Sequence, residues 1–176
     1  AFNKLFGKIP ILLFHKVDQE NDTIWKSVSP DQFLIILEFF KKKYNFIKPK
    51  ELFTLPRKEL RNSAIIVFDD ALNSFYEYAF PILKKLQIPV SVFVPVECVN
   101  RKEVIWTSQI NTCFKYTKEK EFSIILGNKK YYFDLSTGKK RGKASIFIQK
   151  RLKRVTDKEE KEKVIEIKKR LQYDEG

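Results

Sequence analysis

The sequence predicts an α/β protein in which a parallel sheet or barrel is followed by a hairpin and further helices. Three apolar runs, at residues 9–14, 64–68 and 88–95, alternate with two amphipathic segments. Continuous apolar runs of this length are typical of strands that are covered on both faces, as in parallel sheets. Alternating strands and helices with short links indicate right-handed βαβ units, and this pattern stops near residue 96.

The first two elements are predicted from an apolar run and from the start signals of a helix. Residues 9–14 form the first expected strand, and His15 follows it directly. Ser29 is a favourable N-cap, Pro30 suits the first helical turn, and Gln32 stands where its side chain can reach back to the cap. The helix that follows has one apolar face, made of Phe33, Ile36, Leu37, Phe40 and Tyr44.

The second expected strand ends in two adjacent carboxylates. Residues 64–68 are apolar, and Asp69 and Asp70 come directly after them. A helix is expected over residues 74–86. Pro81 lies inside it, and the backbone hydrogen bond that proline cannot make predicts a kink there. The third expected strand covers residues 88–95.

The last third of the chain has a different character. Residues 122–126 and 131–135 are two apolar stretches around a Gly-Asn turn signal, which predicts a β-hairpin. Two helices are expected over residues 144–155 and 158–171, with narrower and more heavily charged faces than the earlier helices. We interpret this part as an excursion that packs on the preceding domain.

The composition narrows the class of protein. Of the 176 residues, 43% are hydrophobic, which is enough for a folded core, and two cysteines are too few for a disulfide framework. The net charge of +13 would attract a polyanion, but it comes mostly from scattered lysines, so we predict a solvated surface and no specific nucleic-acid partner. The run at residues 9–14 is too short for a transmembrane segment and is not a signal peptide. The compartment stays open.

Three polar side chains are expected to meet at one rim of the sheet. His15 follows the first strand and Asp69 and Asp70 follow the second, and ligands of parallel α/β proteins bind at the carboxyl ends of strands. Two neighbouring carboxylates suit metal-assisted hydrolysis, in which one binds an ion and the other accepts a proton from water. They could equally cap the next helix or form a turn, and His15 could be a packed rim residue.

At these residues the sequence resembles the polysaccharide deacetylase family, also called the NodB-homology or carbohydrate esterase family 4 domain. Residues 11–17 are similar to the family's opening strand and its Tyr-His-x-Val variant, and residues 67–70 to its first catalytic motif, Thr-Phe-Asp-Asp-Gly. Residues 76–85 and 89–94 are similar to the helix and strand that follow, and Trp106 to a tryptophan beyond them. The resemblance covers about residues 9 to 110.

This resemblance implies a fold, an activity and a set of roles. Residues 1–110 would form the N-terminal part of a distorted (β/α) barrel, and residues 111–176 a hairpin and helical insertion packed on it after the third strand. The family hydrolyses N- or O-acetyl groups on polysaccharides or oligosaccharides with a bound zinc, cobalt or nickel ion, and is mostly envelope-facing or secreted. By resemblance, Asp69 would be the general base and Asp70 a metal ligand. His15 and Trp106 would line the substrate pocket.

Two departures from the family pattern affect this expectation. Ala71 stands where the family has Gly, and Ala tolerates a positive φ less well, which predicts a reshaped loop. The second motif, His-Ser/Thr-x-x-His, is absent, and zinc needs about three protein ligands while His15 is the chain's single histidine. We therefore expect a truncated portion rather than an evolved pseudoenzyme, with weak or no metal binding and no acetate release by this chain alone.

Two other functions remain open. A non-catalytic basic module would hold an anionic glycan or another polyanion, and its binding would be salt-sensitive and unchanged by Asp70→Ala. A magnesium-dependent phosphoryl-transfer enzyme would use Asp69 and Asp70, but the sequence lacks both a Gly-rich phosphate loop and an Asp-x-Asp pattern.

Overall fold

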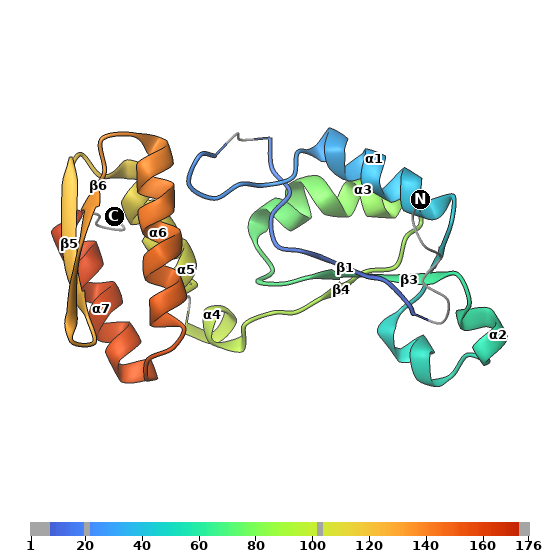
Figure 1. The fold of residues 1–176 in the computed structure, drawn as a ribbon. Helices are drawn as coiled ribbons and strands as arrows, with labels where there is room; N and C mark the ends of the chain where they lie inside the picture. The colour runs from blue at the N-terminus through green and yellow to red at the C-terminus, as the bar shows by residue number, and fades with distance from the viewer. Residues whose placement is uncertain (1–7, 20–21, 102–103, 173–176) are drawn as a thin grey trace. The chain divides into compact units, whose positions relative to one another are not determined.

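The computed structural model describes residues 8–19, 22–101 and 104–172 of the chain (Figure 1). The chain forms two compact units. Unit 1 comprises Ala1–Asn21 and Ser27–Arg101, and unit 2 comprises Asp22–Lys26 and Lys102–Gly176. The sequence-based boundary at residue 110 lies inside a helix of unit 2, whereas the two units divide between residues 101 and 102.

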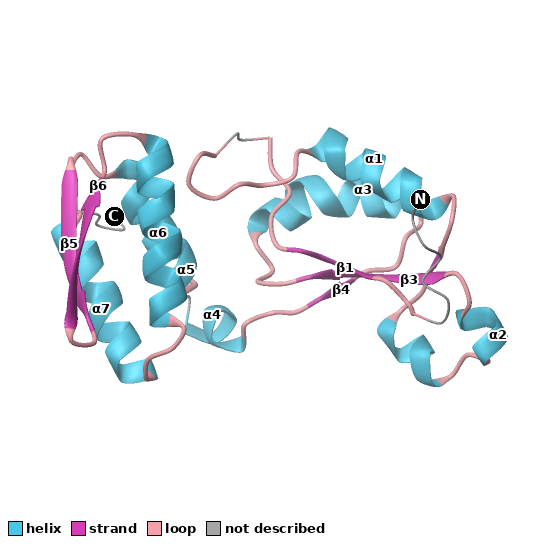
Figure 2. Ribbon diagram, viewed as in Figure 1, coloured by secondary structure: helices cyan, strands magenta, loops and turns pink. Residues whose placement is uncertain are grey.

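Helices and strands alternate along unit 1, whereas unit 2 consists of a hairpin and three helices (Figure 2). Unit 1 contains β1 (Ile11–Phe14), α1 (Pro30–Lys41), β2 (Asn45–Phe46), η1 (Pro49–Phe53), α2 (Arg57–Leu60), β3 (Ser63–Phe68), η2 (Phe75–Ala79), α3 (Phe80–Lys85), β4 (Ser91–Val92) and α4 (Val96–Arg101). Unit 2 contains α5 (Trp106–Tyr116), β5 (Glu121–Leu126), β6 (Lys129–Asp134), α6 (Gly138–Leu152) and α7 (Asp157–Arg170).

Strand β3 is the centre of a four-stranded parallel sheet in unit 1. On one edge it pairs with β1, from Ile11↔Ile65 to Phe14↔Phe68. On the other edge it pairs with β2 at its start and with β4 at its end. The prediction of an α/β protein with parallel strands is therefore confirmed, although the third strand, expected over residues 88–95, is paired only at Ser91–Val92.

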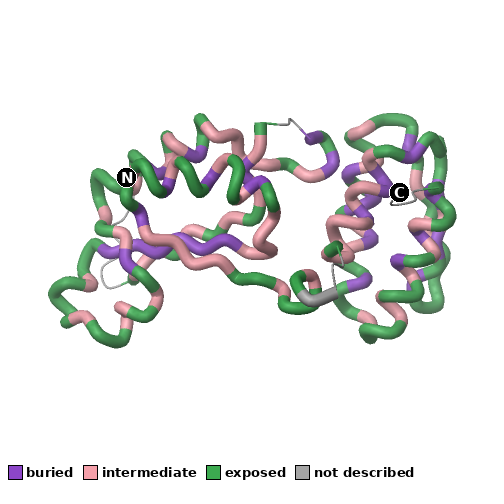
Figure 3. The backbone as a smooth tube through the Cα atoms, turned by 180° about the vertical axis from the view of Figure 1, so that it is seen from behind, coloured by how far each residue is buried: buried purple, intermediate pink, exposed green. Residues whose placement is uncertain are grey.

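The main core of unit 1 lies between the sheet and the helices α1 and α3, which cover the same face (Figure 1). All six residues of β3 are buried, and the buried run is continuous along the strand (Figure 3). Phe68 lies at the end of this strand, with ring centroids 5.4 Å from Phe14 and 5.7 Å from Phe33. These ring contacts fix the position of the end of β3, and Asp69 comes directly after that end.

The prediction that the first strand is covered on both faces is wrong for one face of β1. Ile11 and Leu13 are 61% and 53% exposed. On this face of the sheet the segment from η1 to α2 packs on Ile65 and Val67 of β3, and no element in the described part of the chain covers the neighbouring side chains of β1. A continuous apolar run indicates that a strand suits burial on both faces. Whether both faces are covered depends on other segments of the chain.

The start of α1 is confirmed, whereas the second helix differs from its prediction. Ser29 and Gln32 form the expected reciprocal cap, with the Gln32 N–H donating to Ser29 Oγ at 3.2 Å. In place of one kinked helix there is a π-helical turn, η2, followed by α3 with Pro81 in its first turn. The Phe80 N–H donates to the Phe75 carbonyl in this wider turn. Pro81, which has no N–H to donate, then lies in the first turn of α3, where proline is tolerated.

Unit 2 is built from a hairpin packed on three helices. The strands β5 and β6 pair antiparallel from Glu121↔Asp134 to Leu126↔Lys129, and Gly127 takes the positive φ of 59° that the turn requires. This confirms the predicted hairpin.

In the described ranges no helix of either unit combines the length and the apolarity needed to span a bilayer.

Helix α6 begins earlier than predicted because its glycines are packing residues. Thr137 is its N-cap, and its side chain accepts a hydrogen bond from the Lys140 N–H. A Cβ added at Gly142 would lie 2.9 Å from the Thr23 carbonyl oxygen, closer than real Cβ contacts allow. The glycine that indicated a loop in the sequence therefore allows residues 22–26 to lie against the helix.

Asp22 is a buried carboxylate that joins the segment 22–26 to the rest of unit 2. It accepts hydrogen bonds from the N–H groups of Ile24 (2.8 Å) and Trp25 (3.3 Å), and Oδ2 lies 3.3 Å from the Lys115 ammonium. Burial by itself would raise the pKa of the Asp22 carboxyl, but these partners outweigh burial and hold the pKa below its ordinary value. The ionised carboxylate is therefore the form that stabilises the unit.

Asp22→Asn is expected to lower the free energy of unfolding by about 1.5–3 kcal/mol at neutral pH, because charge-assisted hydrogen bonds are lost. The folded-state pKa is depressed, so this contribution is present above the unfolded-state pKa of about 3.9 and is lost as the pH falls through the folded-state pKa. Urea unfolding of both proteins at neutral and acid pH measures the difference. Exposed Glu162→Gln is the control. A penalty that does not shrink in acid would contradict this role.

Candidate functional site

The strand ends of unit 1 bring two of the predicted site residues together. His15 follows β1 and Asp69 follows β3, and these neighbouring parallel strands end in register at Phe14↔Phe68. The Asp69 N–H continues the sheet by donating to the Phe14 carbonyl at 2.9 Å. His15 Nε2 lies 3.9 Å from Asp69 Oδ2, which is too long for a direct hydrogen bond. The two side chains are 46% and 34% exposed and are therefore accessible to a ligand.

The backbone at Asp70 and Ala71 turns through an uncommon conformation. Their φ angles are 72° and 46°, in the left-handed region that favours glycine. Such strain is of order 1–3 kcal/mol per residue and is concentrated at functional sites and switches. Ala71 thus adopts the positive φ that the family's Gly would adopt easily, and the loop carries strain at the position where the sequence departs from the family.

Ala71→Gly is expected to raise the free energy of unfolding by about 0.5–1 kcal/mol, since relief of left-handed strain exceeds the added entropy of glycine in the unfolded chain. Equilibrium urea unfolding measures this change. Ala79→Gly is the matched control, because Ala79 is buried with a φ of −79° and should be destabilised by the same replacement. Destabilisation at both positions would contradict strain at Ala71.

Trp106, the remaining predicted site residue, belongs to unit 2. It is the first residue of α5 and is partly buried against the hydrophobic core of that unit. Its assignment to a substrate pocket stays a prediction.

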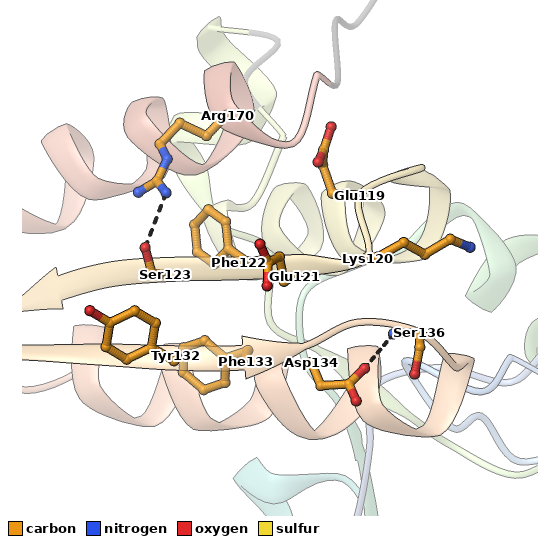
Figure 4. Close-up of a pocket in the computed structure, with 10 residues that line it drawn as sticks. All are labelled: Glu119, Lys120, Glu121, Phe122, Ser123, Tyr132, Phe133, Asp134, Ser136 and Arg170. Atoms are coloured by element: carbon orange, nitrogen blue, oxygen red, sulfur yellow. Dashed lines mark hydrogen bonds between the residues drawn. The ribbon is translucent and has the colours of Figure 1, made fainter.

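Unit 2 contains a groove of about 750 Å³ along its hairpin (Figure 4). The residues that line it come from β5, β6, their flanking loops and α7: Glu119, Lys120, Glu121, Phe122, Ser123, Tyr132, Phe133, Asp134, Ser136 and Arg170. Sequence reasoning assigned none of these residues to a site. The available signal was the spacing of Tyr132 and Asp134 two residues apart on a predicted strand, which places both side chains on one face.

Two of the groove's charged side chains are held by neighbours. Arg170 donates from one guanidinium nitrogen to Glu166 at 3.1 Å, and its guanidinium lies 4.7 Å from the centre of the Phe122 ring. Asp134 accepts from the Lys140 ammonium at 2.6 Å and from the Ser136 N–H at 2.8 Å. The hydrogen bond from Lys140, with those from Ser136, holds the pKa of Asp134 well below its ordinary value, so this carboxylate stays ionised in mild acid.

The comparisons with known proteins point to one class of enzyme. No family model matches the chain. YxkH of Bacillus subtilis (strain 168), which is named as a polysaccharide deacetylase, is 25% identical to it over 108 residues. Part of this chain resembles polysaccharide deacetylases. The match covers 59% of this chain and 38% of YxkH, so the chain spans less than half of that relative.

Solved structures also match part of the chain. IcaB from Ammonifex degensii is 28% identical, with 49% of this chain and 37% of IcaB covered, at a TM-score of 0.42. The Streptococcus pyogenes deacetylase PplD, solved in complex with acetate, is 26% identical, with 58% and 50% covered, at a TM-score of 0.46. These scores do not establish a shared barrel.

The polysaccharide deacetylase resemblance implies a divalent metal, and the donor set around Asp70 can be compared with that expectation. Zinc usually takes about three protein ligands and keeps a fourth position open. Over the described ranges, no three His, Cys, Asp or Glu side chains are placed to hold a metal ion. His15, Asp69 and Asp70 therefore do not fit a complete metal site by themselves.

Proposed function

We propose that this chain belongs to a carbohydrate deacetylase, which hydrolyses acetyl groups on a polysaccharide or oligosaccharide. The observation that carries the proposal is the meeting of His15 and Asp69 at the ends of two neighbouring parallel strands, with Asp70 next in the chain. The resemblance to YxkH supports the same class of reaction. On this basis unit 1 is the N-terminal part of a distorted (β/α) barrel.

The roles in this proposal are those that the resemblance to polysaccharide deacetylases implies, and they suit the chemistry of the three side chains. Asp69 is the general base, whose carboxylate accepts a proton from the water that attacks the acetyl carbonyl carbon. Asp70 is a ligand of the metal ion. His15 lines the substrate pocket beside Asp69. A divalent ion held in part by Asp70 would polarise the acetyl carbonyl.

The test measures acetate release and metal content. The protein translated from the complete reading frame is expected to release acetate from N- or O-acetylated oligosaccharides, to lose this activity on chelation, and to regain it with zinc, cobalt or nickel. The 176-residue chain alone is expected to bind zinc weakly. Absence of acetate release by the metal-loaded complete protein would overturn the deacetylase proposal. Tight stoichiometric zinc binding by the 176-residue chain would contradict the conclusion that its donor set is incomplete.

A further inference from the structure

Helix α6 and the turn that follows it concentrate the positive charge of the chain. Residues 138–154 contain eight Lys and Arg and no Asp or Glu, so they contribute +8 of the net charge of +13. All the other residues together contribute only +5. Most of the net charge is therefore carried by one short segment of unit 2.

The charges of α6 repel one another. Its first turn contains cations and no acidic residue, although the positive end of the helix dipole favours carboxylates there. Lys139 and Lys143 are four residues apart and Lys150 and Lys153 are three apart, spacings at which side chains are neighbours and like charges repel. Helix α7 has the favourable arrangement, with acidic residues in its first turn, basic residues in its last turn, and ion pairs to Glu166. A bound polyanion would relieve the repulsion within α6.

Four of these cations form an exposed row, which we call the α6 basic face: Lys139, Lys143, Lys150 and Lys153. Their spacing places them on one side of a helix that has 3.6 residues per turn. The opposite side packs into the core of unit 2 through Ala144, Ile148 and Leu152. Lys140 is held by Asp134, but in the described ranges the side chains of the α6 basic face make no hydrogen bond or ion pair. Their ammonium groups are therefore available to a ligand.

The α6 basic face is long and narrow. Between Lys139 and Lys153 the helix rises by about 21 Å, at 1.5 Å per residue. Ile146 lies in the middle of the row and is 49% exposed. A small anion would contact only one or two of the lysines, whereas an extended polymer with repeated negative charges matches the whole row.

The side chains favour a polysaccharide among the anionic partners of this shape. A helix that binds a lipid surface inserts its apolar side, and this side of α6 is buried in unit 2. Nucleic acids are held best by the guanidinium fork of Arg and, when single-stranded, by exposed aromatic rings. The row has only Lys, and the neighbouring Phe147 ring is half-buried with the Arg151 guanidinium 5.3 Å from its centre. Exposed Ile146 suits the apolar face of a sugar ring.

We propose that the α6 basic face binds an acidic polysaccharide, one whose repeating units carry carboxylate or phosphate groups. The four ammonium groups contact successive anionic groups, and Ile146 packs against a sugar ring. The inference rests on the proposed function for the role of this polymer, which is the acetylated substrate. A second point of attachment raises the effective concentration of the polymer at the protein that deacetylates it.

The experiment is a calorimetric titration of the 176-residue chain with three polysaccharides at neutral pH. Polygalacturonate carries carboxylates, phosphomannan carries phosphates, and dextran is neutral. At least one of the two acidic polymers is expected to bind, with an affinity that falls as salt is added, and the stronger of the two identifies the preferred anionic group. Dextran is not expected to bind. Absence of binding to both acidic polymers in low salt, or equal binding of dextran, would overturn the proposal.

Paired substitutions locate the binding. Lys143→Gln with Lys150→Gln should weaken binding of the acidic polymer by about tenfold, the effect of losing two exposed ion pairs. Lys84→Gln with Lys85→Gln is the matched control, because it removes the same charge from exposed positions of α3. It should leave the affinity within about twofold. Equal weakening by both pairs would show only a general attraction to a cationic chain and would overturn the assignment to α6.

Double-stranded DNA and phosphatidylglycerol vesicles represent the other anionic partners. The polysaccharide assignment is wrong if Lys143→Gln with Lys150→Gln weakens binding of DNA or vesicles and leaves polysaccharide binding unchanged. In the complete protein, the same pair should raise KM for an acetylated acidic polysaccharide with little change in kcat. Binding of the acidic polymer by α6 without acetate release by the complete protein would count against the deacetylase proposal alone.

Discussion

Asp69→Asn is expected to lower acetate release by the complete protein by about 10²–10⁴-fold, the range that a positioned general base contributes. Asn keeps the size of the side chain but cannot accept a proton from water. The Asp69 backbone N–H still donates to Phe14, so the loop should keep its place. The loss should therefore fall on kcat, with little change in the free energy of unfolding.

Glu59→Gln is the control for this change, because it removes an exposed carboxylate from α2 in the same unit. It should leave acetate release within about twofold, as surface substitutions usually do. Activity of the Asp69→Asn protein equal to that of the Glu59→Gln protein would remove Asp69 from the role of base. Loss of activity together with loss of folding would instead assign Asp69 a structural role.

Phe68→Ala is expected to lower the free energy of unfolding by about 3–5 kcal/mol, which is the usual cost of removing a buried phenyl ring. Phe68 is fully buried, and its ring contacts those of Phe14, Phe33 and Phe75, the last at 4.8 Å between centroids. The cavity would open directly beneath the strand end that positions Asp69. Urea unfolding followed by fluorescence measures the change.

Phe53→Ala provides the matched comparison, because the Phe53 side chain is 90% exposed. The same deletion there should change the free energy of unfolding by less than about 0.5 kcal/mol. Similar penalties at both positions would show that the aromatic cluster around Phe68 is not the core that supports the site.

The meeting of His15 and Asp69 followed from local sequence signals. Each residue directly follows a continuous apolar run, and parallel strands carry their carboxyl ends to the same edge of a sheet. The helix start at Ser29 was equally local, since a cap is made within four residues. These features depend on short-range geometry, and for this reason they could be predicted without a structure.

Other features depend on neighbours that are distant in the sequence. Gly142 is a loop signal by composition, but its role is set by the Thr23 carbonyl more than a hundred residues away. The exposure of Ile11 depends on what covers one face of β1, and the groove depends on the register that opposes Glu121 to Asp134. None of these contacts leaves a periodic pattern in the sequence.

The sequence by itself determined the parallel strand–helix order, the hairpin, and the placement of His15, Asp69 and Asp70 after their strands, because periodicity, caps and turn signals are local. Only the tertiary structure decided that Ala71 adopts a positive φ, that residues 22–26 pack in unit 2, and that Tyr132 lies beside two carboxylates. The physical reason is that strain, close backbone approach and the charge of a groove arise from pairs of segments that meet only on folding.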